Sequence, residues 1–245
     1  MVEPRTYRTL VASGRLTAFE VSVKETDLHV QAGSDLSAVT RDRILEQRGY
    51  LETYIRRHPE FVSTLNPWPL TGPAPNIVHD MIAAGNAAGV GPMAAVAGAL
   101  AEHVGRGLLA HTQEVIIENG GDIFLQTGEA VTVAVFAGVS PLSLRIGIRI
   151  GGQNDPIAAC TSSGTVGHSL SFGRADAVCV VSRSGALADA SATAIGNRIH
   201  CEQDIPAGIE FAKRITGVLG VLIVVAEKMG AWGSLEVVVL DRKNG

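Results

Sequence analysis

Asp189 and Thr193 form the residue pair whose types and spacing most strongly suggest chemistry. They lie four positions apart in Ala188-Asp-Ala-Ser-Ala-Thr-Ala194, where the residues between and around them are small. On a helix, side chains four apart project from one face on neighbouring turns. A carboxylate beside a hydroxyl suits Mg²⁺, which is usually bound through one or two carboxylates, water and substrate phosphates. The same spacing also fits a helix that packs through its small residues, with Asp189 near the positive N-terminal end.

A second candidate site is the segment Thr161-Ser-Ser-Gly-Thr-Val-Gly-His168. Its hydroxyl groups and flexible backbone could surround a phosphate or a carbonyl group. His168 could act as an acid, a base or a hydrogen-bond donor. An ordinary polar loop between two strands would explain the same composition, so both interpretations stay open. The candidate ligand-binding residues here are Thr161, Ser162, Ser163 and Gly164.

A third segment, Asn119-Gly-Gly-Asp122, carries two polar side chains around two glycines. An Asn-Gly step supplies the positive φ that tight hairpin turns need. The residues alone therefore predict a turn between two strands at Asn119, Gly120, Gly121 and Asp122.

Hydrophobic periodicity places these segments in a mixed fold. The expected strands are residues 17–24, 28–31, 114–118, 122–126, 131–135, 144–150, 175–182, 218–226 and 235–240. Helical spacing covers residues 37–57, 76–105 with a break near Gly89-Val-Gly-Pro92, 185–199 and 206–216. Residues 161–173 are expected to form a loop rich in Gly and Ser.

The element order of the first half is strand, strand, helix, helix, strand, strand, and the second half repeats it. This predicts an α+β fold made of two related subdomains packed together, residues 1–130 and 131–245, with the metal site in the second. The repeat is one of element order and not of sequence.

Composition limits the partners and the compartment. The formal net charge is −4 and no block of Lys and Arg appears, so we expect no nucleic-acid partner. Three cysteines without a C-x-x-C pair predict free thiols. The first ten residues carry charges and lack the apolar region of a signal peptide. The longest apolar run, Val218 to Ala226, is far shorter than the roughly 20 residues that a membrane span needs. We expect a cytoplasmic protein without a membrane partner, whose Ala- and Gly-rich surface permits a homodimer.

Taken together, these motifs resemble those of the flavin-transferase (ApbE-like) family over roughly residues 90–200. Asn119-Gly-Gly-Asp-Ile123 is similar to the family's N-x-G-G-D-I loop, and Thr161-Ser-Ser-Gly164 to its T-S-G turn. His168 falls where the family has a His, and residues 188–194 are similar to its A-D-A-x-A-T-A segment. The small-residue stretch Ala94 to Glu102 stands where the family begins its A-x-A-K-G helix.

The resemblance implies an α+β fold with two related subdomains and Mg²⁺-dependent cleavage of FAD. In that activity FMN is transferred to a Thr or Ser of an acceptor protein or is released by hydrolysis. Asp189 and Thr193 would hold the metal, residues 119–122 and 161–164 would bind the flavin nucleotide, and His168 would assist proton transfer.

The sequence also departs from the family pattern. A small apolar residue near Ala97 replaces the family's Lys, and Ser-Leu-Ser-Phe-Gly follows His168 where the transferases have D-P-x-T-G. These changes affect substrate binding more than the metal pair. The sequence thus predicts a divergent branch that binds or cleaves FAD or a related phosphorylated cofactor. A non-catalytic cofactor-binding module on the same fold and a metal-free enzyme that uses residues 161–168 remain alternatives.

Overall fold

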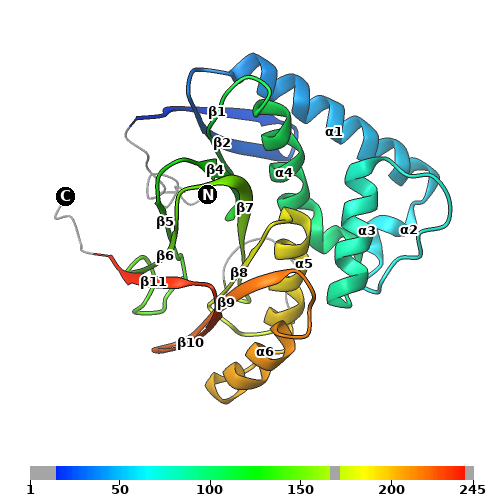
Figure 1. Ribbon diagram of the computed structural model, residues 1–245. Coiled ribbons are helices and arrows are strands. Elements are labelled where there is room, and N and C mark those ends of the chain that lie inside the picture. The colour runs from blue at the N-terminus through cyan, green and yellow to red at the C-terminus, as the bar shows by residue number, and fades with distance from the viewer. Residues whose placement is uncertain (1–14, 166–171, 241–245) are drawn as a thin grey trace.

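The computed structural model describes residues 15–165 and 172–240, which form two antiparallel sheets and a layer of helices (Figure 1). The larger sheet has eight strands in the order β1-β2-β3-β4-β7-β8-β9-β10, and the smaller has the order β11-β6-β5. The strands are β1 Thr17–Val23, β2 Thr26–Ala32, β3 Val115–Asn119, β4 Asp122–Thr127, β5 Val131–Ala134, β6 Ile146–Ile150, β7 Gln153–Ser162, β8 Ala177–Ser182, β9 Val218–Val225, β10 Lys228–Gly233 and β11 Glu236–Val239. The helices are α1 Ser37–Arg57, α2 Glu60–Ser63, α3 Asn76–Ala88, η2 Pro92–Ala95, α4 Val96–Leu108, α5 Gly185–Gly196, η3 Glu202–Asp204 and α6 Ile205–Ala212.

The centre of the larger sheet is buried on both faces. Along β7, Ala158 and Cys160 belong to the core shared with the helices, while Ala159 between them packs with residues of the smaller sheet. This alternation follows from the period of two along a strand. It also explains why β9 is a nearly continuous apolar run rather than an alternating one. The molecule therefore has three layers, with the long sheet in the middle.

A third core lies under the first hairpin. Ile44 of α1 packs there with Leu28 and Val30 of β2 and with Val104 and Leu108 of α4. Ile44 recurs on one stripe of α1 with Leu51, which is also buried, as the helical spacing predicted. This core holds α4 against the strands that carry the 119–122 turn.

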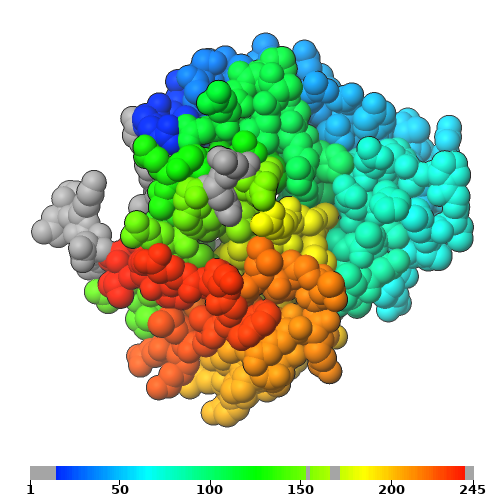
Figure 2. Space-filling model, viewed as in Figure 1, coloured from blue at the N-terminus to red at the C-terminus, as the bar shows by residue number. Residues whose placement is uncertain are grey.

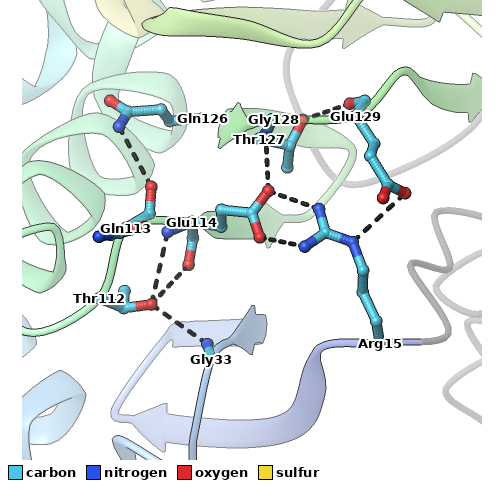
Figure 3. Close-up of polar contacts among 9 residues, drawn as sticks. All are labelled: Arg15, Gly33, Thr112, Gln113, Glu114, Gln126, Thr127, Gly128 and Glu129. Atoms are coloured by element: carbon cyan, nitrogen blue, oxygen red, sulfur yellow. Dashed lines mark hydrogen bonds and ion pairs between the residues drawn. The ribbon is translucent and has the colours of Figure 1, made fainter.

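One polar cluster joins the start of the smaller sheet to the larger one. The Glu114 carboxylate accepts hydrogen bonds from Arg15 and from the Gly128 backbone amide (2.6 Å), while Arg15 also pairs with Glu129 at 3.3 Å (Figure 3). The cluster fixes the connection between β4 and β5 against the beginning of β3.

The structure confirms the predicted α+β class. In the larger sheet the two halves contribute β1-β2 and β3-β4, then β7-β8 and β9-β10, with helices between the pairs of each half. The division at residue 130 stays a prediction, and β4 pairs with β7 across it. The break near Gly89 is also present: α3 ends there, with Gly89 at φ 76°, and α4 begins after Pro92.

The strands predicted at 131–135 and 144–150 are present as β5 and β6, but they form the smaller sheet, and β7 and β8 take their place in the repeated element order of the second half. β7 was missed because Pro156 and the polar residues at its end favoured a loop, and β10 because two of its six residues are glycine. The strand predicted at 235–240 is present as β11, Glu236–Val239, and it pairs with β6 in the smaller sheet.

No single helix among the described residues is long and apolar enough to cross a membrane. By length and composition only, α3 and the segment of η2 and α4 are together long and apolar enough, but the two are bent by 106° relative to each other.

Candidate functional site

The candidate site is built on the crossing of α4 and α5, where two glycines touch. A methyl group on Gly98 would lie 2.2 Å from the Gly185 carbonyl oxygen, and one on Gly185 would lie 2.4 Å from the Gly98 carbonyl oxygen. No side chain fits at either position, so the two backbones are in direct contact. This crossing brings the N-terminal ends of both helices together.

Each helix offers a carboxylate to the other helix at this crossing. Asp189 of α5 accepts a hydrogen bond from the Gly98 amide of α4 (2.9 Å). Glu102 of α4 accepts one from the Gly185 amide of α5 (2.7 Å). Each acid stands four residues after its own glycine, in Gly98-Ala-Leu-Ala-Glu102 and Gly185-Ala-Leu-Ala-Asp189. Amides at helix N-termini lack partners within their own helix and carry partial positive charge, so carboxylates suit them.

The two carboxylates differ in their charge balance. Glu102 forms a salt bridge with Arg106 one turn further along α4 (2.9 Å). Among the described residues, Asp189 has no cationic side chain within ion-pair distance. Burial raises the pKa of Asp189 to about 7, and the amides of Gly98 and Ala97 only partly oppose this shift. Asp189 is therefore a desolvated acid without a counter-ion in the described part of the chain.

A second buried acid, Asp122, lies at the start of β4 close to Asp189. Its carboxylate accepts a hydrogen bond from the Thr161 amide of β7 (3.2 Å). Burial, and after it the charge of Asp189, raise the pKa of Asp122 well above its usual range. The same two carboxylates add to the effect of burial in raising the pKa of the Cys160 thiol, so the three groups share one neighbourhood.

The turn between β3 and β4 forms the rim of this neighbourhood. Asn119 pairs with Asp122 in register, and Gly120 and Gly121 have φ values of 66° and 104°, as the Asn-Gly signal predicted. The Asn119 amide group donates to the Ala97 carbonyl oxygen at the start of α4 (3.0 Å). The turn is thereby held against the helix end that binds Asp189.

The predicted 161–164 loop is only partly a loop. Thr161 and Ser162 are the last residues of β7 and pair with β8, which corrects the expectation of a loop beginning at residue 161. Ser162 faces the end of α5, where a methyl group on Gly196 would lie 3.7 Å from its hydroxyl oxygen. Ser163 Oγ accepts from the Thr165 amide (3.1 Å), and the Gly164 amide donates to the Ala175 carbonyl oxygen (2.8 Å). Of this segment, Thr161 makes the contact with Asp122.

Thr193 lies one turn beyond Asp189 on α5 and is partly buried. Asn197, another turn on, accepts a hydrogen bond from the Phe172 amide (2.9 Å). Residues 189, 193 and 197 share one helix face. In the view of Figure 2, neighbouring segments cover much of α5, shown in yellow. His168 lies outside the described residues.

The structure thus brings Asn119, Asp122, Thr161 and Asp189 together, with Thr193 one turn away. The residues that the sequence interpretation missed are Gly98, Glu102 and Arg106. Their signal was the repeated Gly-Ala-Leu-Ala-acid segment, which gains meaning only once the helices are known to cross.

The donor set favours Mg²⁺ over metals that need a closed cage. Among the described residues, no group of three or more His, Cys, Asp or Glu side chains could hold an ion. The residues present are two buried carboxylates and a nearby hydroxyl, which leaves positions for water and for phosphate oxygens, as Mg²⁺ prefers. The uncompensated charge of Asp189 fits such an ion.

A family model described as AbpE bacteria matches residues 8–213. The chain belongs to this family. It is 39% identical to a UPF0280 protein of Methanococcus aeolicus over 91% of the chain and 93% of that protein. A UPF0280 protein of Methanocaldococcus jannaschii is 42% identical over 82% of the chain and 84% of that protein.

Solved structures of flavin transferases share the fold at low sequence identity. The apo flavinyl transferase ApbE of Pseudomonas stutzeri matches with a TM-score of 0.58 at 13% identity, over 89% of this chain and 94% of that one. The flavin transferase ApbE of Vibrio cholerae matches with a TM-score of 0.59 at 13% identity, over 89% and 97% of the two chains. These matches confirm the ApbE-like fold.

Proposed function

We propose that this protein binds FAD or a related phosphorylated cofactor together with Mg²⁺ at the α4–α5 crossing. The observation that carries the proposal is Asp189, a buried carboxylate that has no cationic partner among the described residues and lies beside a second acid, Asp122. A buried charge without a partner is costly unless a proton or a cation compensates it. The family and the shared fold point to the same ligand class.

Each of the candidate site residues has a distinct part in this proposal. Asp189 and Thr193 hold the ion, and Asp189 keeps its hydrogen bond from the Gly98 amide. Asn119, Gly120, Gly121 and Asp122 form the rim that contacts the nucleotide, together with Thr161. Bound Mg²⁺ would neutralise the pyrophosphate charge and stabilise charge that develops at phosphorus. His168 is proposed as the proton-transfer residue from its place in the sequence motif.

Isothermal titration with FAD tests the proposal, with and without Mg²⁺. Wild-type protein should bind FAD more tightly with Mg²⁺, and Asp189→Ala should lose that gain. Asp155→Ala is a matched control, because Asp155 is exposed and pairs with Arg183 on the surface. Absence of FAD binding in both conditions, or an unchanged Mg²⁺ gain in Asp189→Ala, would overturn the proposal.

Turnover separates the two versions of this function. As a transferase or pyrophosphatase, the protein would release AMP from FAD and pass FMN to water or to a Ser or Thr of an acceptor protein. The small residue Ala97 at the start of α4, in place of the family's Lys, favours the second candidate, a module that binds without turnover. Chromatography of FAD incubated with Mg²⁺ and protein distinguishes them: AMP appears in the first case and FAD stays intact in the second.

A further inference from the structure

Glu102 is a buried acid that the proposed ligand contacts leave out. It is 7% exposed and lies between α4 and α5. Its Oε2 atom accepts from the Gly185 amide at 2.7 Å and lies 3.4 Å from the Ser184 hydroxyl, while Oε1 accepts from Arg106 Nε at 2.9 Å. Both carboxylate oxygens are occupied by the protein itself, so Glu102 is not available to bind an ion.

The contact of Glu102 with α5 fixes the place of Asp189. Gly185 is the first residue of α5, and Asp189 stands one turn later on the same helix. At the crossing, a methyl group on Gly98 would lie 2.8 Å from Asp189 Cβ, so Asp189 sits directly over α4. Because the two backbones touch, a small rotation or slide of α5 would move Asp189 relative to Asp122 and the 119–122 turn.

We propose that Glu102 is a positioning residue that holds α5 by its first amide and thereby keeps Asp189 in place beside Asp122 and the 119–122 turn, where it can bind a divalent cation. This inference rests on the proposed function, because it assumes that Asp189 binds such an ion. The role requires an oxygen that reaches the Gly185 amide. It does not require the negative charge, which Arg106 already balances.

Mn²⁺ binding to the full chain, followed by electron paramagnetic resonance of the free ion, measures this role without an activity assay. Glu102→Ala removes the oxygen and should weaken Mn²⁺ binding at least tenfold. Glu102→Gln keeps an oxygen that can accept from Gly185 and should stay within about threefold of wild type. Arg106→Gln is the matched control, because it removes the ion pair but leaves the Glu102–Gly185 hydrogen bond. It should lower the unfolding temperature and keep the Mn²⁺ affinity within about threefold of wild type.

The outcomes separate this inference from the proposed function. If wild-type protein binds Mn²⁺ and Glu102→Ala binds it equally well, the positioning role is wrong while the metal site stands. If Arg106→Gln loses as much affinity as Glu102→Ala, general loosening explains the loss and the role is again wrong. If wild type binds no Mn²⁺, both proposals fail. Should Glu102→Ala not fold, Glu102→Asp replaces it, because its side chain is one methylene too short for Gly185 and predicts the same loss.

Discussion

The segments Gly98–Glu102 and Gly185–Asp189 have nearly the same sequence and the same local geometry, but their acids have different surroundings. Each begins with a glycine at the crossing and ends with an acid that binds the other helix. Glu102 has Arg106 as its counter-ion, whereas burial without a described cationic partner raises the pKa of Asp189 to about 7. The comparison indicates that the carboxylate–amide hydrogen bond is enough to join the two helices. That Asp189 lacks a cationic partner among the described residues, while Glu102 has one, therefore requires a further explanation.

The largest expected effect comes from breaking the crossing itself. Gly98→Ala places a methyl group 2.2 Å from the Gly185 carbonyl oxygen, and the helices must separate. We expect the free energy of unfolding to fall by about 3 kcal/mol, measured by urea denaturation. Gly49→Ala is the control, because nothing lies within 4 Å of a methyl group there. In this exposed helix position alanine should stabilise the protein by about 0.5–1 kcal/mol. Equal effects of both substitutions would contradict the close contact.

The pH dependence of stability in wild type and in Asp189→Asn tests whether the buried Asp189 lacks a counter-ion. The pKa of Asp189 is raised from 3.8 to about 7, so the folded protein holds this proton more tightly than the unfolded chain. Its contribution to stability is therefore complete below about pH 4 and is lost as the pH rises to about 7. The variant has no such proton, so the stability of wild type relative to Asp189→Asn should fall across this range in metal-free buffer.

Mg²⁺ supplies the second half of that test. Above pH 7, Mg²⁺ should raise the unfolding temperature of wild type and leave Asp189→Asn unchanged, because a ligand of the folded state stabilises it. Some pH dependence should remain in the variant, since burial alone still raises the pKa of Asp122. A difference in stability that stays flat from pH 4 to 7 would argue that Asp189 is a structural cap only.

Arg106→Gln makes the two segments more alike. Without Arg106, Glu102 becomes a buried acid that has no cationic partner among residues 15–165 and 172–240, as Asp189 is now. The expected cost is about 1 kcal/mol at neutral pH, since the Arg106 side chain is half exposed and solvent screens the pair. Thermal unfolding at low and high salt measures it, and the cost should shrink at high salt, because salt screens charges that solvent reaches. A cost that does not depend on salt would mean that packing, not charge, is what Arg106 supplies.

Asn119→Ala concerns only the Asp189 side of the comparison. It removes the hydrogen bond to the Ala97 carbonyl oxygen and should cost about 1 kcal/mol in urea denaturation. Gln126→Ala removes a similar but exposed bond to the Gln113 carbonyl oxygen and should cost clearly less. If the two variants are equally stable, Asn119 does not anchor the turn.

Local patterns predicted much of this molecule. The Asn119-Gly-Gly-Asp122 turn, the break at Gly89 and the position of α5 all follow from neighbouring residues. The adjacency of Asp189 to the 119–122 turn was expected only through the family resemblance. Residue spacing alone could not predict this adjacency, because it depends on the contact between Gly98 and Gly185, which are distant in sequence.

The failures also have physical causes. In β7, Pro156 and the terminal Thr161 and Ser162 gave a loop-like composition, yet pairing on both sides made the segment a strand. Glu102 reads as a polar position on an amphipathic helix until its partner on α5 is known. Long-range pairing decides both cases, and no single window of sequence contains it.

The occupied helix ends have one more consequence. Helix N-termini commonly receive phosphate groups, because their free amides face outward. At this crossing the amides of Gly98 and Gly185 already bind the protein's own carboxylates. An incoming phosphate would therefore meet the negative charge of these carboxylates, where other folds present free helix N-terminal amides. An anionic ligand can bind beside Asp189 only if it brings a cation with it.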